Sequence, residues 1–215
     1  MSYIAERRSE EKERRRIEIL EAAEGLYVTL GWDGVTMEAV ARSARLSRAL
    51  LYVYFRDKDE LLFGIGHRAL EVLRERFAAA VARQDRGLEQ VEAIGRAYIA
   101  YAHEFPHYFD FCSRFQSRSG TADSGSNENA CKLTGDEVLG TVVQAIMNGI
   151  SDGSVRADIG DPRMFATTLW AFTHGIIQLA LVKGVELTRH GIAVPAFIDN
   201  AFGLLRRMAQ GSNPA

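Results

Sequence analysis

Several side chains between residues 36 and 58 have the chemistry needed to hold a phosphate or the edge of a base. The segment reads TMEAVARSARLSRALLYVYFRDK. Arg48 can reach a phosphate or a guanine edge, and Tyr52 can donate its hydroxyl to a phosphate. Ala49, with its small side chain, lets the backbone come close to a partner. Together these residues form one face of a short helix, and the chemistry of that face suits a DNA groove.

A helix-turn-helix would position this face. Such a motif needs a small residue where its two helices touch, a tight turn, and an apolar plug on the second helix. Ala41 supplies the small residue, SARLS the turn, and Leu46 and Leu51 the plug. Thr36 and Ser47 are suited to cap the two helices. Taken alone, the pattern also fits an ordinary helical bundle in which this helix pair never meets DNA.

Helical patterns continue on both sides of this segment. An apolar stripe at Ile17, Leu20, about Ala23, Leu26 and Leu30 predicts a helix that ends at Gly31. Asp57 and Glu60 have the spacing of a capping box and predict the start of a long fourth helix. Further helices are predicted over residues 87–105, 107–116, 135–150, 162–184 and 195–210.

No strand pattern competes with these helices, so the predicted fold class is all-α. We expect a three-helix bundle with a helix-turn-helix in residues 1–56, followed by a larger helical domain in residues 57–215. The length of 215 residues and the 47% hydrophobic content are ordinary for a globular protein with a real core. Residues 117–130, rich in Ser, Gly and Asn, are expected to form a mobile loop.

Charge and cysteine content restrict the possible functions. The formal net charge is -2, and the first 60 residues carry 11 Lys and Arg against 12 Asp and Glu, so any DNA binding must depend on local placement. Cys112 and Cys131 fit no paired metal or redox spacing, and no charged-then-apolar leader opens the chain, which favours the cytoplasm. No apolar run approaches the roughly 18 residues of a membrane span, so no membrane partner is expected.

The string TMEAVARSARLSRALLYVYFRDKDELL resembles the DNA-binding signature of the TetR (tetracycline-repressor-like) family of transcriptional regulators. The resemblance covers about residues 10 to 62 and fixes residue types at many positions: a threonine-capped helix, the pair SR, a tyrosine, an aromatic pair and a lysine. It implies phosphate contacts from Thr36, Tyr52 and Lys58. The DNA-binding residues predicted in this way are Thr36, Arg45, Ser47, Arg48, Ala49, Leu50, Tyr52, Val53, Tyr54 and Lys58.

Two positions depart from the family pattern. Arg45 stands at the turn position that is usually glycine, so it is expected to adopt a positive φ at a cost of about 1 kcal/mol. Val53 stands where a polar residue or a histidine is common, which would make base reading there apolar, for example against a thymine methyl. Because of both changes, the operator sequence does not follow from the resemblance.

The resemblance also implies a variable C-terminal domain that dimerises and binds an effector. LWAFTHGIIQLAL resembles the tryptophan and histidine-glycine helix of one subset of these domains. Dimerisation would use residues 162–184 and 195–208, which are apolar on more than one face. A homodimer on a palindromic operator, released by a small molecule, is the default function. The alternative is that the protein activates transcription.

Aromatic residues cluster in the C-terminal part, where Phe115 and Phe172 belong to the same wider set. Such a set forms a plain core in many proteins, but its size and its polar members favour a pocket for a mainly apolar or aromatic molecule. The predicted effector-binding residues are Tyr98, Tyr101, Phe105, Tyr108, Phe109, Phe111, Met147, Trp170, His174 and Gln178.

An enzymatic function has no support in the sequence. No nucleophile with a base, paired carboxylates or phosphate-binding loop is visible, and GIGHRAL lies in a helical pattern without a preceding strand. His103 and His107 are four residues apart, but Pro106 separates them and no further ligand completes a metal site. We predict no catalytic residue, cofactor or metal. The competing function is a helical protein-interaction bundle without DNA binding.

Overall fold

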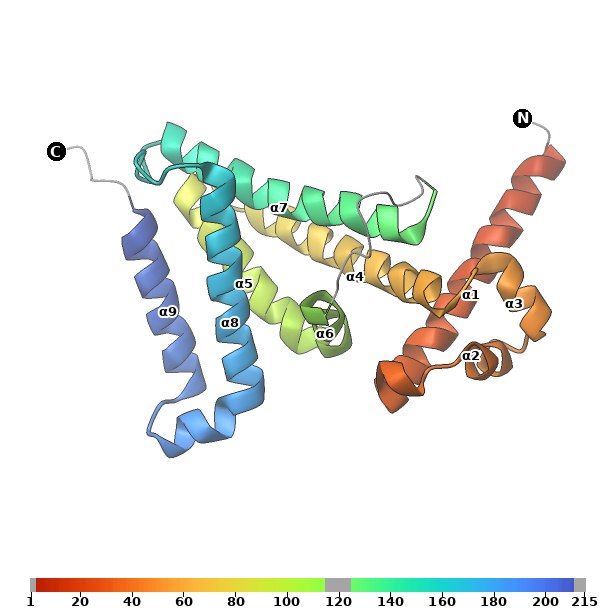
Figure 1. Ribbon diagram of the computed structural model, residues 1–215. Coiled ribbons are helices and arrows are strands. Elements are labelled where there is room, and N and C mark those ends of the chain that lie inside the picture. The colour runs from red at the N-terminus through yellow and green to blue at the C-terminus, as the bar shows by residue number, and fades with distance from the viewer. Residues whose placement is uncertain (1–2, 115–124, 211–215) are drawn as a thin grey trace. The chain divides into compact units, whose positions relative to one another are not determined.

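The computed structural model describes residues 3–114 and 125–210, and helices account for nearly all of them (Figure 1). No strand of a sheet occurs in these ranges, so the predicted all-α class is confirmed. The helices are α1 (Tyr3–Gly34), α2 (Met37–Ser43), α3 (Arg48–Tyr54), α4 (Lys58–Val81), α5 (Gly87–Glu104), α6 (Pro106–Arg114), α7 (Asn127–Ser151), α8 (Pro162–Arg189) and α9 (Val194–Ala209).

The chain packs as two compact units. Unit 1 comprises Met1–Leu70 and Asp110–Leu133, and unit 2 comprises Glu71–Phe109 and Thr134–Ala215. Helices α4, α6 and α7 each contribute residues to both units. The first part of α4 belongs to unit 1, and the expected domain boundary at residue 56 stays a prediction.

Helix α1 packs in unit 1 through part of the expected face, which includes Leu20 and Ala23. Its buried residues are Ile19, Leu20, Ala23 and Tyr27. The expected stripe was wrong at both ends, since Ile17 is 41% exposed and Leu30 is 54% exposed. The packed face includes an aromatic residue, Tyr27, whose hydroxyl donates to Asp110 at 2.6 Å. Apolar spacing alone favoured the leucines over this tyrosine.

A break near the end of α1 leads into the helix pair that was predicted as a helix-turn-helix. Gly31 has φ 67°, the left-handed backbone that glycine adopts without strain. Helix α2 then buries Met37, Val40 and Ala41. Helix α3 buries Leu51, which has no exposed surface, and is followed by the equally buried Phe55. The small residue and the plug therefore lie where the motif requires them.

The start of α4 confirms half of the predicted capping box. The Asp57 carboxylate accepts the backbone N–H of Glu60 at 2.7 Å. The Glu60 carboxylate instead accepts the backbone N–H of Asn127 at 3.0 Å. The Asn127 side chain in turn donates to the Glu60 carbonyl at 2.8 Å and accepts a hydrogen bond from Arg16.

These contacts explain why α7 begins earlier than the sequence indicated. Residues 127–130, expected to belong to a mobile loop, are helical because Asn127 is anchored on α1 and α4. The remainder of the expected loop lies mostly in residues 115–124, which, with Phe115, fall outside the described residues.

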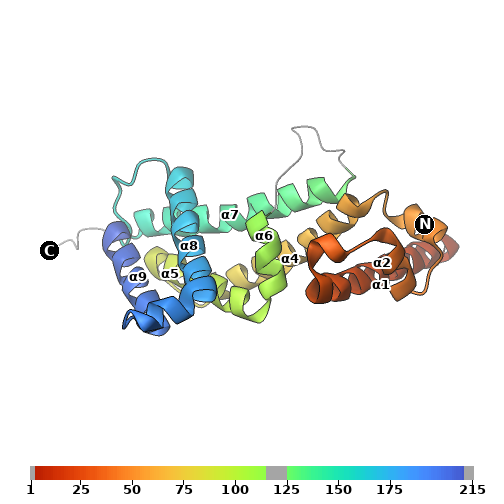
Figure 2. The ribbon, with the colours of Figure 1, turned by 60° about the horizontal axis from the view of Figure 1, so that its bottom comes forward.

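Unit 2 contains the two last helices, α8 and α9, which lie side by side in both views (Figures 1 and 2). Asp161 caps α8 as predicted, accepting the N–H of Met164 at 2.9 Å. Helix α8 continues to Arg189, beyond the expected end at Gly184, with irregular backbone at Lys183 (φ -116°, ψ 15°). The apolar pattern is interrupted near Gly184 by a local distortion of the helix at Lys183, not by the end of the helix.

Helix α8 is strongly apolar, and much of its apolar surface is exposed in the single chain. By length and composition it is compatible with a membrane span, with a mean hydropathy of 1.4 over its most apolar window, of which only 28% is buried. Its outward side chains include Leu179, Val182 and Val185, which are 47%, 65% and 82% exposed. An apolar surface of this kind marks a site of contact with another surface.

Candidate nucleic-acid interface and effector region

Helix α3 divides its side chains between two faces. Leu51 faces the core of unit 1, while Leu50, Tyr52 and Val53 are 40%, 42% and 71% exposed. Arg48 and Ala49 are exposed as well. We call Arg48, Ala49, Leu50, Tyr52 and Val53 the outward face of α3. The structure brings these five predicted DNA-binding residues together on one short helix.

Two hydroxyl groups cap the helices of this motif. The Thr36 hydroxyl accepts the N–H of Ala39 at 3.1 Å, and the Ser47 hydroxyl accepts the N–H of Leu50 at 3.2 Å. Both residues are exposed. A hydroxyl that accepts one hydrogen bond can still donate its proton. Thr36 and Ser47 can therefore hold their helices and also donate to a phosphate.

Arg48 and Tyr52 lie one helical turn apart and contact each other. The guanidinium carbon of Arg48 is 5.7 Å from the centre of the Tyr52 ring, and an Arg48 nitrogen lies 3.5 Å from the tyrosine hydroxyl. Such a contact restricts both long side chains at an exposed site. Two donors suited to a phosphate are thus held next to each other on the outward face of α3.

The turn between α2 and α3 has the backbone that the sequence predicted. Arg45 has φ 56° and is the one non-glycine residue with positive φ in the described parts of the chain. Its side chain is exposed, and its backbone N–H donates to the carbonyl of Arg42 at 3.2 Å. The expected left-handed conformation at this position is confirmed.

Lys58 and Tyr54 have partners inside the chain. The Lys58 ammonium donates to the carbonyl of Trp32 at 2.7 Å and lies 4.7 Å from the centre of the Trp32 ring. The carbonyl of Tyr54 accepts from Arg16 at 3.5 Å. Lys58 therefore ties the start of α4 to the end of α1. The predicted phosphate contact of Lys58 stays a prediction, as does the predicted DNA-binding role of Tyr54.

Sequence reasoning missed the contacts made by Arg16 and Trp32. Besides its bond to Tyr54, Arg16 places its guanidinium carbon 4.7 Å from the centre of the Phe55 ring. For Arg16 a signal was available, because it lies three residues before the buried Ile19 on the same side of the helix. For Trp32 no local spacing connects it to Lys58.

Most of the predicted effector-binding residues meet in unit 2. Phe109 stacks on His174 with ring centres 4.7 Å apart, and Tyr98 lies 5.7 Å from Phe109. Further ring contacts extend this group along α5, α6 and α8. The aromatic cluster, as we call it, consists of Tyr98, Tyr101, Phe105, Tyr108, Phe109, Trp170 and His174.

A polar pair lies inside this aromatic cluster. The hydroxyl of Tyr98 and Nδ1 of His174 are 2.8 Å apart and share a hydrogen bond. Burial lowers the pKa of His174, because the charged ring loses hydration there. A neutral imidazole and a phenol give the cluster a polar position that could orient a ligand in an otherwise apolar region.

Three predicted effector residues are not members of the aromatic cluster as defined above. Phe111 belongs to unit 1, where its ring occupies the space beside Gly66, so that a Cβ at Gly66 would lie 1.9 Å from it. Met147 is 50% exposed on α7. Gln178 is half-buried on α8, one turn beyond His174. The effector set as a whole therefore stays a prediction, and Phe111 is placed in the other unit.

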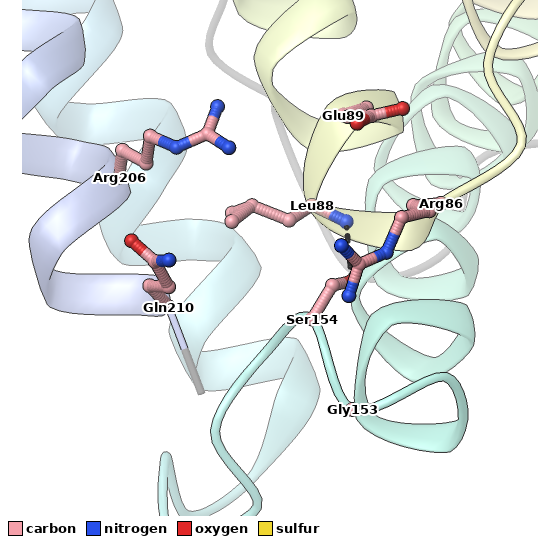
Figure 3. A pocket seen from close by; sticks show the side chains of 7 residues that line it. All are labelled: Arg86, Leu88, Glu89, Gly153, Ser154, Arg206 and Gln210. Atoms are coloured by element: carbon pink, nitrogen blue, oxygen red, sulfur yellow. Dashed lines mark hydrogen bonds between the residues drawn. The ribbon is translucent and has the colours of Figure 1, made fainter. Parts of the chain in front are cut away.

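A small, open pocket lies elsewhere in unit 2 and is lined mainly by polar atoms (Figure 3). It lies between the start of α5, the turn after α7 and the end of α9. The backbone N–H of Leu88 donates to the Ser154 hydroxyl at 3.0 Å at its floor, and Arg206 pairs with Glu92 at 2.9 Å. Its lining residues are Arg86, Leu88, Glu89, Gly153, Ser154, Arg206 and Gln210, none of which belongs to the predicted effector set.

The two cysteines are free thiols in unit 1. Cys131 is buried, and its thiol donates to the carbonyl of Phe63 at 3.0 Å. Burial raises its pKa to about 12, which keeps the thiol protonated at neutral pH. Cys112 is half-buried on α6. A buried, protonated thiol is a core residue rather than a reactive group.

Comparisons with known proteins agree with these placements. Residues 19–65 match the model of bacterial regulatory proteins of the tetR family, and residues 91–197 match the model of the tetracyclin repressor-like C-terminal domain. The chain is 36% identical over 90 residues to the HTH-type transcriptional regulator HbdR of Aromatoleum sp. (strain CIB), a match that covers 41% of this chain and 38% of that relative.

Solved structures with the same fold cover nearly the whole chain. A protein of unknown function from Rhodococcus sp. RHA1 superimposes with a TM-score of 0.76 at 21% identity, over 91% of this chain and 95% of that one. FadR from Bacillus subtilis, solved in complex with stearoyl-CoA, superimposes with a TM-score of 0.68 at 12% identity, over 89% of this chain and 98% of that one.

Proposed function

Because the chain belongs to the TetR family and is a DNA-binding transcriptional regulator, we propose that it is a homodimeric repressor released from a palindromic operator by a small-molecule effector. The observation that carries this proposal is the outward face of α3. This face is exposed, and on it Arg48 and Tyr52 contact each other. A cytoplasmic location goes with this function, because the bacterial chromosome lies there.

A homodimer is supported by the exposed apolar surface of the last two helices. On α8 the outward residues include Gly175, Leu179 and Val182, and a Cβ built at Gly175 would meet no atom within 4 Å. On α9, Leu204 and Met208 are 42% and 47% exposed. A second copy of the chain would cover this surface. It would also provide a second α3, which a palindromic site requires.

The proposed effector is a mainly apolar or aromatic small molecule bound at the aromatic cluster of unit 2. Seven rings from three helices supply the apolar lining, and the bond between Tyr98 and His174 supplies a polar anchor. FadR of Bacillus subtilis, which shares the fold, is described in complex with stearoyl-CoA. A ligand with a long apolar part is consistent with the cluster of this chain.

Replacing Arg48 by alanine is expected to weaken binding to duplex DNA. If Arg48 contacts a phosphate, binding weakens on all sequences alike, and the slope of log K against log salt falls by about 0.9 for each phosphate that the protein no longer neutralises. If it contacts a guanine, the cost is about 1–3 kcal/mol on the operator and the preference at that position relaxes. Fluorescence anisotropy with a labelled duplex over a salt series measures both quantities.

The matched control is Arg83→Ala, which removes the same charge from an exposed position just after α4 in unit 2. Tyr52→Phe, which deletes only the hydroxyl, should give a smaller loss than Arg48→Ala. If the unaltered protein does not bind duplex DNA, or binds it independently of salt, a protein-interaction bundle would replace the regulator.

An effector of the proposed class is expected to raise the melting temperature. A ligand at about 100 times its Kd adds about 2.7 kcal/mol, and each kcal/mol shifts the midpoint by about 2–4 °C in a chain of this length. Thermal-shift screening of aromatic compounds and acyl-CoA esters tests this. A hit should lose its effect in the variant Tyr98→Phe/His174→Phe. A hit that is unchanged in this variant would move the ligand away from the aromatic cluster.

A further inference from the structure

The first four turns of α1 extend beyond the core of unit 1 (Figure 1). All residues from Ala5 to Arg14 are exposed, and from Ala5 onward the first buried side chain is Ile19. This segment also precedes residue 19, where the match to the family model begins. A helical extension that buries nothing gains no stability from packing, so its charges decide what it can do.

The charges of this extension are partly separated by face. Arg8, Lys12 and Arg15 recur at steps of four and three residues, which places them on one face of the helix. We call these three residues the basic stripe. Glu6, Glu10 and Glu13 follow the same spacing on the opposite face. The separation is incomplete, because Glu11 lies beside the basic stripe and Arg7 and Arg14 lie outside it.

The basic stripe continues the face of α1 that packs in unit 1. Four residues after Lys12, Arg16 reaches the carbonyl of Tyr54 at the end of α3. Ile19 and Ala23 follow on the same side and are fully buried. With a rise of 1.5 Å per residue, Arg8 lies about 12 Å along the helix from Arg16. The stripe thus overhangs the side of α1 on which α3 lies.

The arrangement on the stripe opposes helix stability. Arg8 and Lys12 are a like-charged pair four residues apart, and so are Lys12 and Arg16, a spacing at which like charges repel. Within residues 3–114 and 125–210 neither Arg8 nor Lys12 has an ion pair, whereas Arg15, the third residue of the stripe, pairs with Glu18 at 2.7 Å. On another side of the helix, by contrast, Arg14 pairs with Glu11 at 2.7 Å. A polyanion beside the stripe would remove this repulsion.

We propose that the basic stripe binds the sugar-phosphate backbone of the duplex whose groove α3 enters. This proposal rests on the proposed DNA binding and adds a second, sequence-independent contact to it. Its chemistry is that of flexible cations on a phosphate surface, which strengthens binding without reading bases. The contact also gives a chain with a formal net charge of -2 a locally basic surface for DNA, because Glu6, Glu10 and Glu13 lie on the opposite face of the extension.

The test compares two double variants of equal charge. Arg8→Gln/Lys12→Gln neutralises the basic stripe, and Arg7→Gln/Arg14→Gln neutralises two exposed arginines on a different side of the same turns. Glutamine is a good helix former, so both variants should keep the helix. Binding to a labelled duplex of random sequence, spanning several helical turns, is measured over a salt series, with circular dichroism as the check on helix content.

The stripe variant should lower the slope of log K against log salt by about 0.9 for each phosphate left without its cation, about 1.8 per protomer, while the control variant keeps the slope of the unaltered protein. Equal slopes for the two variants would overturn the proposal, whether both fall or neither does. Arg48→Ala distinguishes failure of the stripe contact from failure of DNA binding by α3. If it weakens binding while the stripe variant does not, DNA binding by α3 stands and the stripe contact fails.

Discussion

Replacing Leu179 and Val182 by glutamate is expected to turn the dimer into a monomer and to weaken operator binding by at least about 10²-fold. The two side chains are 47% and 65% exposed in the single chain, so the change leaves its own core intact. In a dimer the same positions would be buried, and an unpaired buried carboxylate is strongly unfavourable. A monomer has one DNA-binding unit in place of two linked ones, so it loses the gain in affinity of about 10²–10⁴ that linkage provides.

Sedimentation or size-exclusion chromatography with light scattering gives the mass, and anisotropy with the operator duplex gives the affinity. The control is Leu133→Glu, which places one such carboxylate at a 56% exposed leucine of α7 in unit 1. The control should remain dimeric and bind normally. A double variant that keeps the mass of a dimer would show that α8 is not part of the interface.

The second large effect is expected from Leu51→Ala, with a loss of about 2–5 kcal/mol in the free energy of unfolding. Leu51 has no exposed surface and is the plug that holds α3 in unit 1. Few other side chains secure this helix, since it has seven residues. The stability of a whole domain is about 5–15 kcal/mol, so the loss is a large part of it.

Chemical denaturation followed by circular dichroism measures this loss. Leu50→Ala is the matched control. Leu50 is adjacent to Leu51 and has the same side chain, but it is 40% exposed on the outward face of α3. Leu50→Ala should leave the free energy of unfolding within about 0.5 kcal/mol of the unaltered value, as expected for a surface position. Equal losses in the two variants would mean that α3 is not seated through Leu51.

The parts of the fold that could be predicted are those governed by local chemistry. Thr36, Ser47 and Asp161 cap helices as their residue types indicate. Arg45 takes a positive φ because the tight turn leaves no alternative. The division of α3 into a buried and an exposed face followed from helical spacing, since Leu51 and Phe55 are four residues apart.

The parts that escaped prediction depend on partners far away in the sequence. Helix α7 begins at Asn127 because Glu60 and Arg16 hold it, 67 and 111 residues distant. The sequence around Lys58 predicts a phosphate ligand, but in the structure its ammonium donates to the carbonyl of Trp32. Phe111 looks like a member of the aromatic cluster by spacing, but it packs in unit 1, because the boundary between the units falls within α6.

The contact between Lys58 and Trp32 also has a spectroscopic consequence. The chain has two tryptophans, and the structure assigns Trp32 to unit 1 and Trp170 to unit 2. An ammonium group 4.7 Å from the Trp32 ring makes the emission of that indole sensitive to any movement of α4 against α1. With Trp170 replaced by phenylalanine, intrinsic fluorescence would report on the DNA-binding motif alone. The converse variant would report on the effector region, without any attached dye.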